Sequence, residues 1–422
     1  MKIAMTTHGT RGDIQPFVSL ARALMQRGHD VVLGTPVNLI SFVERCGVRA
    51  SPLAVDSQAF MESPEGRRWL SSGNAQKFMK ELGAVIHAHR DELIADTLRL
   101  SEGADVLVTG LLTEDFASTV AEARKLPLLA VHFNGMRMNS RYANWLVSSR
   151  KLPPFLNRAT HSLAEAAWWS GNKADVNHFR QHLGLARTNL STYKRMRKLG
   201  ACTIHAFSPS IAPPPSEYVD AMPVVGSIHF PDFIRSGLGE STPEQGLVNW
   251  LAAGTPPVFF GMGSMPVENP EVMLQQIADV SRKLGKRALI GAGWSRLDGA
   301  KNLPAHVRIV GAVDHGWLLP QCCAAIHHGG AGTVQAVLTA GLPAVVTSVF
   351  ADQPFWGEQC QRQGVGVHLP FKKLNARTLE EALRKVLQAE FKSAAQKLGQ
   401  AVRAEPDATP LIADRIESLL IA

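Results

Sequence analysis

Short apolar runs alternate along the chain with longer segments in which apolar residues recur every three or four positions. In the first half, IAMTT, VVLGT, VLVTG and LLAVHF have the length and composition of strands. Between them, residues 14–27, 38–46 and 113–123 carry the apolar spacing of helices. Strands that alternate with helices predict a parallel sheet covered on both faces.

The same alternation restarts in the second half. PPVFFGMGS, RALIGAG, VRIVGAV and CAAIHH are predicted strands, and 270–284, 379–389 and 411–420 are predicted helices. The two series predict an α/β protein with two doubly wound, Rossmann-like domains. Open sheets of this kind bind ligands at the carboxyl ends of their strands, so we expect the domains to face a central cleft.

Two segments interrupt the alternation and define the predicted domains. Residues 137–200 read as a helical insertion, whereas SPSIAPPPSEYVDAMPVVG is too rich in proline for a helix or an inner strand. We predict an N-terminal domain over 1–210 and a linker over 211–226. A second domain would cover 227–404, and a last helix would lie within 405–422.

Composition limits the class of protein. With 422 residues and 45% hydrophobic content, the chain is too long for one core. Its five cysteines include no CxxC pair, so they favour reduced core thiols over a zinc site or disulfides. A signal peptide and an apolar run long enough to span a membrane are both lacking, which predicts a cytoplasmic protein.

Positive charge is concentrated in the insertion. Residues 137–200 hold twelve Lys and Arg against two acidic residues, Glu165 and Asp175, so the segment has a net charge of +10. Because the whole chain has a net charge of +8, the remainder has about −2. Tryptophans 145, 168 and 169 lie in the same segment. The segment could be a solvated helical face whose aromatic side chains line a pocket. It could instead contact an anionic membrane surface or an acidic partner. We do not expect it to bind nucleic acid.

The motif HHGGAGT joins a predicted strand to a predicted helix. Its glycines, Gly329, Gly330 and Gly332, leave the backbone bare where the helix begins, and unpaired N–H groups and the helix dipole favour an anion there. A diphosphate could dock at this point, with donors from His328 and Thr333. The spacing matches neither a dinucleotide fingerprint nor a P-loop, although glycine-rich turns are also common structural features of such folds.

Polar residues follow other strands of the second half. Asp352 and Gln353 come after the next strand and suit the hydroxyl groups of a sugar, so the pair and the diphosphate site predict a nucleotide-sugar site. Further predicted donor contacts at strand ends are Ser264, Trp294 and Val313, with Gly12 from the first half. For Trp294 a structural role is nearly as plausible.

The first strand leads into THGTRGDIQP, which holds His8 and Asp13. Asp13 could take the proton of an acceptor hydroxyl if burial raises its pKa, or it could simply cap the helix beginning near Ile14. His8 is a second base, an acceptor contact or a structural residue. Weaker acceptor contacts are predicted at His132, Met136 and Trp145.

Metal and cofactor are not expected. The chain has no DxD-type carboxylate pair near these turns, so the helix start and His328 would stabilise the charge of a leaving diphosphate.

Four motifs together resemble the GT-B superfamily of nucleotide-sugar glycosyltransferases, family 1: GTRGDIQPFVSLARAL, FFGMGSM, HHGGAGTVQAVLTAGLP and FADQPFWGEQC…GVG. Within it the chain is most similar to the branch with sterol 3-beta-glucosyltransferases and antibiotic and rhamnolipid glycosyltransferases. The resemblance covers essentially the whole chain. It implies an inverting, metal-independent transferase whose last helix crosses back onto the N-terminal domain.

The resemblance also implies residue roles. His328 takes the position of the phosphate contact and Ser264 of another donor contact, while Asp352 and Gln353 take that of the pair reading the sugar hydroxyls. Asp13 lies where the antibiotic and sterol branches place a catalytic Asp, which favours the base over the cap. Residues 314–317, DHGW, depart from the PHDW-like stretch of sterol enzymes, and the long membrane-targeting regions of fungal members are absent, which favours a small bacterial enzyme.

These features favour the transfer of glucose from UDP-glucose to a hydroxyl of an apolar acceptor of sterol, polyketide, flavonoid or hydroxy-fatty-acid type. A dTDP-deoxysugar such as dTDP-rhamnose is the alternative donor. A UDP-sugar epimerase and a non-catalytic nucleotide-sugar-binding protein are alternatives of another class, and the hydrophobic insertion argues against the epimerase.

Overall fold

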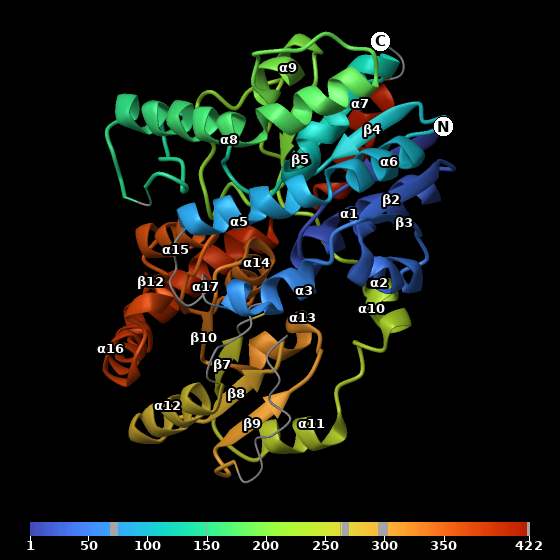
Figure 1. Cartoon of the computed structure of the whole chain (residues 1–422). Helices are drawn as coiled ribbons and strands as arrows, with labels where there is room; N and C mark the ends of the chain where they lie inside the picture. The colour runs from blue at the N-terminus through green and yellow to red at the C-terminus, as the bar shows by residue number, and fades with distance from the viewer. Residues whose placement is uncertain (68–74, 149, 262, 264–269, 294–302, 420–422) are drawn as a thin grey trace.

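Two parallel six-stranded sheets, one in each half of the chain, form the framework of the protein (Figure 1). The computed structural model describes residues 1–422 apart from 68–74, 149, 262, 264–269, 294–302 and 420–422. The sheets follow one another along the chain, each with its own helices. The predicted α/β class with two doubly wound domains is confirmed.

The N-terminal sheet has the strand order β3-β2-β1-β4-β5-β6. Its strands are β1 (Lys2–Thr6), β2 (Asp30–Pro36), β3 (Arg49–Leu53), β4 (Val106–Thr109), β5 (Leu128–His132) and β6 (Cys202–His205). The helices of this half are α1 (Arg11–Gln26), α2 (Ile40–Arg45), α3 (Ser57–Glu62), α5 (Ala75–Ala88), α6 (Arg90–Leu100), α7 (Glu114–Arg124), α8 (Pro154–His182) and α9 (Thr192–Lys198).

The C-terminal sheet has the order β12-β11-β10-β7-β8-β9. Its strands are β7 (Val258–Gly261), β8 (Ala288–Gly291), β9 (Val307–Val310), β10 (Ala324–His327), β11 (Ala344–Val346) and β12 (Gly366–His368). The helices after β6 are α10 (Asp232–Leu238), α11 (Gln245–Ala252), α12 (Pro270–Lys283), α13 (His315–Leu318), α14 (Ala331–Thr339), α15 (Gln353–Arg362), α16 (Ala376–Val386), α17 (Ala389–Arg403) and α18 (Thr409–Ser418).

Both sheets wind in the same way. When the second sheet is counted from its own first strand, its order is identical to that of the first. The chain reverses direction across each sheet between the first and fourth strands, β1 and β4 in one half and β7 and β10 in the other. Ligands of open α/β sheets bind outside the carboxyl ends of the strands at this point. The turn after β1 and the turn after β10 therefore both lie where a ligand is expected.

Several predicted helix bounds need correction. The first helix begins at Arg11 rather than near Ile14. The predicted helix 379–389 ends at Val386, and a separate helix starts at Ala389. Helices α3, α5, α6, α10, α11, α15 and α17 were not predicted. Three of them, α3, α10 and α11, have at most eight residues and span too few turns to show a clear period.

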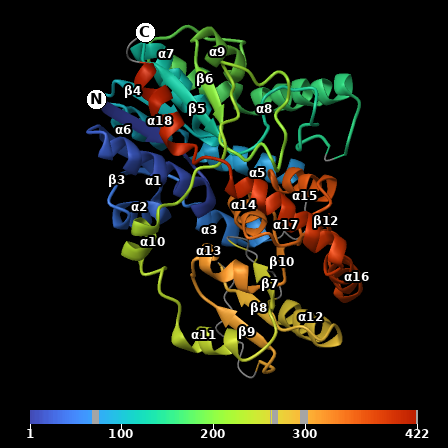
Figure 2. The same cartoon turned by 180° about the vertical axis from the view of Figure 1, so that it is seen from behind.

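Segments that follow the second half in sequence pack on the first half. Ile412 and Ile416 of α18 are fully buried in the N-terminal core beside α1, and Figure 2 shows α18 running next to it. Ile234 and Leu238 of α10 belong to the same core cluster. Packing therefore continues with the N-terminal half beyond residue 227, where we predicted the second domain to start.

The predicted linker 211–226 is partly buried. Ile211 and Ala212 lie in the core of the C-terminal half, and Val224 forms a parallel bridge with His205 at the end of β6. The five cysteines are free thiols. Among the described residues, no helix is long and apolar enough to cross a bilayer.

Candidate functional site

The turn from β1 into α1 holds Asp13 in a capping box. Thr10 is the N-cap residue, and its hydroxyl accepts the backbone N–H of Gly12 at 3.3 Å. Asp13 Oδ2 in turn accepts the backbone N–H of Thr10 at 2.8 Å and the Thr10 hydroxyl at 3.2 Å. Asp13 is thus the third residue of the helix rather than its cap, and the box fixes the position of its carboxylate.

Burial and, to a smaller extent, the carboxylate of Asp352 from the other half of the chain raise the pKa of Asp13 to about 6. Hydrogen bonds from Thr10 act in the opposite direction. A carboxylate whose pKa lies close to neutral pH can accept a proton and still be ionised before the reaction. The effect of Asp352 on this pKa also means that the two carboxylates, one from each half of the chain, are close enough to interact electrostatically.

His8 lies at the start of the same turn. Burial lowers its pKa to about 4, so the imidazole is neutral at physiological pH. Its Nε2 is buried and has no hydrogen-bond partner among the described residues. Gly9 separates His8 from the capping box with φ of 135°, and a Cβ at Gly9 would lie 2.3 Å from Asp13 Oδ2. Glycine is therefore required for the carboxylate to occupy this place.

The turn from β10 into α14 is the second half of the site. His328 follows β10, and burial lowers its pKa to about 4. Its Nδ1 is buried without a hydrogen-bond partner in the described part of the chain. Gly329 has φ of 94°, and a Cβ at Gly330 would lie 2.5 Å from His328 Nε2. The glycines thus leave room for the His328 ring.

The start of α14 has no side-chain cap. Gly330 is the N-cap residue, and the structure gives it no capping hydrogen bond. A Cβ placed on Gly332 in the first turn would meet nothing within 4 Å, and Thr333 in the same turn is partly exposed. Open space thus adjoins backbone N–H groups that lack an intrahelical acceptor, as an anion requires.

Asp352 begins α15 as its N-cap residue. Its Oδ2 accepts the indole N–H of Trp356 at 2.9 Å, and burial raises its pKa. The preceding residue, Ala351, adopts a left-handed conformation with φ of 53°, which is uncommon for a residue with a side chain. Backbone strain of this kind is often found beside functional residues.

Gln353 has a role in its own turn. Its side-chain carbonyl accepts the backbone N–H of Val349 at 2.8 Å and that of Phe350 at 3.3 Å. The amide oxygen thus holds the loop that presents Asp352 to the cleft.

Asn134 is a site residue that the sequence analysis missed. It follows β5, is 8% exposed, and its Nδ2 lies 3.5 Å from Asp352 Oδ2. Its Oδ1 is buried and has no partner within the described residues. Its place just after a strand was the available signal, because strand ends of both sheets meet at the cleft.

His132, one of the predicted acceptor contacts, is 1% exposed and lies in a buried ionic network. Its Nε2 is 2.7 Å from Glu114 Oε1, and Arg137 Nη2 is 2.5 Å from the same oxygen. Burial lowers the pKa of His132, which the Glu114 carboxylate partly offsets. The network fixes the loop that carries Asn134 to the end of β5.

Met136 and Trp145 lie in the loop between β5 and α8 and are partly exposed. Trp145 packs against the core of the C-terminal half. Tyr142, in the same loop, has its ring edge-on to Phe355 with centroids 5.2 Å apart. The loop of the first half therefore rests on the helix that starts at Asp352.

An ion pair connects the turn after β1 with the segment that contacts the loop before α13. Arg11 donates two hydrogen bonds of 2.7 Å to the Glu240 carboxylate, and the Glu240 backbone oxygen accepts the N–H of Asp314 at 3.3 Å. Val313 is partly buried against the core of the C-terminal half, and Gly12 is exposed at the start of α1. The loop predicted to hold the nucleotide base is thus connected to the turn that holds Asp13.

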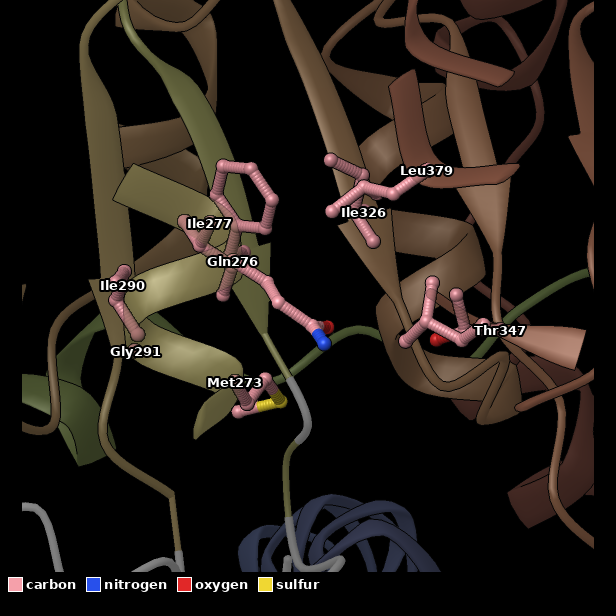
Figure 3. Close-up of a pocket in the computed structure, with 10 residues that line it drawn as sticks. Met273, Gln276, Ile277, Ile290, Gly291, Ile326, Thr347 and Leu379 are labelled. Atoms are coloured by element: carbon pink, nitrogen blue, oxygen red, sulfur yellow. The ribbon is translucent and has the colours of Figure 1, made fainter. Parts of the chain in front are cut away.

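Ser264 and Trp294, two of the predicted donor contacts, lie outside the described residues. An apolar pocket is present on the C-terminal sheet, lined by Met273, Ile277 and Ile290 among others (Figure 3). It lies between β8, β10 and α12 and includes none of the predicted donor or acceptor residues. In the part of the chain that the structure describes, no three His, Cys, Asp or Glu residues are grouped to hold a metal ion.

Two family models match this chain. Residues 3–139 match the glycosyltransferase family 28 N-terminal domain, and residues 271–419 match the C-terminal domain of the erythromycin biosynthesis protein CIII-like family. The first match contains the turn from β1 into α1, and the second contains the turn from β10 into α14.

Relatives of known name are similar over nearly the whole chain. An O-mycaminosyltylonolide 6-deoxyallosyltransferase of Streptomyces fradiae is 34% identical over 96% of this chain and 94% of its own. A sterol 3-beta-glucosyltransferase of Arabidopsis thaliana is 32% identical over 96% of this chain and 63% of its own. Among solved structures, the glycosyltransferase VinC in complex with dTDP has a TM-score of 0.68 at 17% identity, covering 100% of this chain and 99% of that one.

Proposed function

Because the chain belongs to the GT-B glycosyltransferases of family 1, we propose that it transfers a hexose from a nucleotide diphosphate sugar to a hydroxyl group of an apolar acceptor. The observation that carries this proposal is that the loop of Asp352 lies against the first half: Asp352 raises the pKa of Asp13, and Asn134 Nδ2 is 3.5 Å from Asp352 Oδ2. Asp13 lies in the capped turn after β1, and Asp352 lies after β11 at the start of α15.

Asp13 acts as the general base. Its carboxylate removes the proton of the acceptor hydroxyl while that oxygen attacks the anomeric carbon of the donor sugar. The bond from the anomeric carbon to the diphosphate oxygen breaks on the opposite face, so the configuration inverts. Asp13 keeps the proton, and the diphosphate leaves with the bonding electrons. The pKa of about 6 supports this role, because the group is ionised near neutral pH.

The turn after β10 holds the diphosphate. Backbone N–H groups at the start of α14 and the Thr333 hydroxyl bind its oxygens, and His328 donates a further hydrogen bond. These donors stabilise the charge that develops on the leaving group, which makes a metal ion unnecessary. The proposal therefore includes neither a metal nor another cofactor.

Asp352 binds hydroxyl groups of the sugar. Its carboxylate already accepts a hydrogen bond from Trp356, and it has capacity for further donors. A carboxylate in this role favours a sugar with several free hydroxyl groups, and therefore glucose from UDP-glucose. A dTDP-deoxysugar is the second candidate, because one relative is a 6-deoxyallosyltransferase and a similar structure holds dTDP. The loop with Met136 and Trp145 supplies the apolar contacts for the acceptor.

Transfer assays test the proposal directly. Purified protein is incubated in the presence of EDTA with UDP-glucose or dTDP-rhamnose and a panel of sterol, flavonoid and hydroxy-fatty-acid acceptors, and products are identified by mass. We expect a glycoside from one donor, with inverted configuration at the anomeric carbon. An epimerised free donor would identify an epimerase, and a nucleotide sugar that binds but never turns over would identify a binding protein. Either result contradicts the proposal.

A further inference from the structure

The N-terminal half of α8 presents apolar side chains to solvent. Phe155 is 69% exposed, Leu163 is 60% exposed and Leu156 is 40% exposed. Ala159 and Ala166 are exposed as well. At 3.6 residues per turn, these five positions fall on one side of the helix. Figures 1 and 2 show α8 at the outer edge of the N-terminal half.

The charged side chains exposed on the same segment are all cationic. Within the described residues of 137–200 they are Arg141, Arg150, Lys151, Arg158, Lys173, Arg187, Lys194, Arg197 and Lys198. The two acidic residues of the segment are used elsewhere. Asp175 is buried against His87 and Arg90, and Glu165 accepts a hydrogen bond from Ser191.

Some of the positive charge in the segment is neutralised inside the protein. Arg137, Arg180 and Arg195 are buried, and each lies beside a carboxylate of α7. They hold α8, α9 and the loop before α8 against the N-terminal half. The exposed cations are therefore a separate group, and in that group only Arg158 forms an ion pair within the described part of the chain, with Glu217 at 3.6 Å.

From this combination we propose that the exposed side of α8, together with Arg150, Lys151 and Arg158, docks on the surface of an anionic lipid bilayer. Phe155 and Leu163 enter the boundary between headgroups and acyl chains, where apolar side chains are favourable. The three cations beside the first turns of α8 contact lipid phosphates and carboxylates. A second copy of the chain is a poor occupant, because a symmetric contact would bring unmatched cations together.

Vesicle sedimentation of the full chain tests this proposal. Vesicles of phosphatidylcholine are compared with vesicles in which about one third of the lipid is phosphatidylserine, at low and at high salt. We expect binding to the anionic vesicles that weakens with salt. Phe155→Ser with Leu163→Ser should lower the partition coefficient about tenfold, as the loss of two inserted apolar side chains requires.

Matched variants distinguish docking by α8 from general attraction of a basic protein. Arg150→Gln, Lys151→Gln and Arg158→Gln together should lower binding about tenfold or more, since each cation adds to the attraction. The control triple Lys372→Gln, Lys373→Gln and Arg377→Gln removes the same charge from the C-terminal half and should leave binding nearly unchanged.

Val272→Ser is the control for the apolar pair, because Val272 is an exposed residue, 57%, of helix α12. Equal losses in control and test variants, or binding that survives the loss of both apolar side chains, would overturn the proposal. So would sedimentation of the free protein as a dimer that the Phe155 and Leu163 substitutions convert to a monomer. The outcome is separate from catalysis, since neither residue belongs to the proposed reaction centre and donor binding should be unchanged.

Discussion

Two strand-to-helix turns, one in each half of the molecule, lie beside the point where the chain reverses direction across its sheet, and the helix starts there are satisfied in opposite ways. After β1, Thr10 and Asp13 form a capping box that uses the free backbone N–H groups of α1. After β10, the cap position of α14 is Gly330, which has no side chain to use them. Both turns depend on glycine to bring a polar side chain close to the helix.

The difference indicates what each turn can do. A helix start that is already satisfied by its own side chains has little affinity for an anion, but it holds a carboxylate rigidly and partly shields it from water. A helix start without a cap retains its N–H groups and its dipole for an external anion. One topology therefore serves two purposes: proton transfer in the first half and binding of a leaving group in the second.

Removal of the Asp13 carboxylate should have the largest effect. Asp13→Asn keeps the size of the side chain but removes the base, so we expect kcat to fall about 10³-fold while donor affinity stays within about twofold. Steady-state kinetics with calorimetric binding of the nucleotide would measure both quantities. A variant that loses donor binding in parallel with kcat would place Asp13 in the donor site instead.

The same variant should differ in stability with pH. The folded-state pKa of Asp13, about 6, lies above its usual value of 3.8, so ionisation of this carboxyl destabilises the fold. Because the side chain is only partly covered, we expect Asp13→Asn to gain about 1 kcal/mol above pH 6. The gain should vanish below pH 4. Denaturant unfolding at the two pH values measures it, and a gain of equal size at both would exclude the carboxylate as its origin.

Alanine at a single glycine of each turn should separate the two purposes. Gly9→Ala places a Cβ against Asp13 Oδ2 and should lower kcat about 10²-fold with little change in nucleotide affinity. Gly330→Ala displaces the His328 ring and should weaken nucleotide binding about tenfold. If Gly330→Ala lowers only kcat, or Gly9→Ala lowers only nucleotide affinity, the roles proposed for the two turns are wrong.

The pH dependence of the wild-type reaction should reflect the ionisation of Asp13 in the first turn alone. The base must be ionised, so kcat/KM should be constant above about pH 6 and fall about tenfold per pH unit below it. Nucleotide affinity should vary little between pH 6 and 8, because His328, with a pKa of about 4, is neutral throughout that range. A rate that falls as pH rises through 6 would contradict the role of Asp13 as a base.

Loss of the cap should have the smallest effect. Thr10→Ala removes the N-cap hydroxyl and its hydrogen bond to Asp13, and we expect the free energy of unfolding to fall by about 1 kcal/mol. The apparent pKa of the pH–rate profile should rise, because the hydrogen bonds of Thr10 lower the pKa of Asp13. Gly171→Ala in α8 is the control, since this glycine is outside both turns and its Cβ would meet nothing within 4 Å. A profile unchanged by Thr10→Ala would show that the box has no influence on the base.

Much of the architecture followed from local patterns. Alternation of apolar runs with helical spacing predicted both sheets, because a strand buried on both faces and an amphipathic helix each leave their own periodicity in the chain. The glycine-rich turns could be placed at strand ends for the same reason. Short helices such as α3 and α10 were missed, and α1 was started too late because the role of Thr10 as a cap was not considered.

Contacts between distant residues could not be predicted from local patterns. Asn134 lies 218 positions before Asp352, and nothing in either neighbourhood indicates that they meet. His132 carries the same strand-end signal as Asn134 but is turned into an ionic network with Glu114 and Arg137. Which of the two polar residues reaches Asp352 depends on the path of the chain after β5 ends at His132 and on the partners available to each side chain.

The sequence by itself determined the two doubly wound domains, the turns that could hold a diphosphate and a base, and the family that those motifs resemble. The tertiary structure decided that Asp13 and Asp352 come close enough to interact electrostatically, that His8 and His328 are neutral, and which cations of 137–200 stay exposed. The physical reason is that secondary structure reflects interactions between near neighbours in the chain. A pKa, an ion pair or an exposed face depends on desolvation and on groups brought close only when the halves pack together.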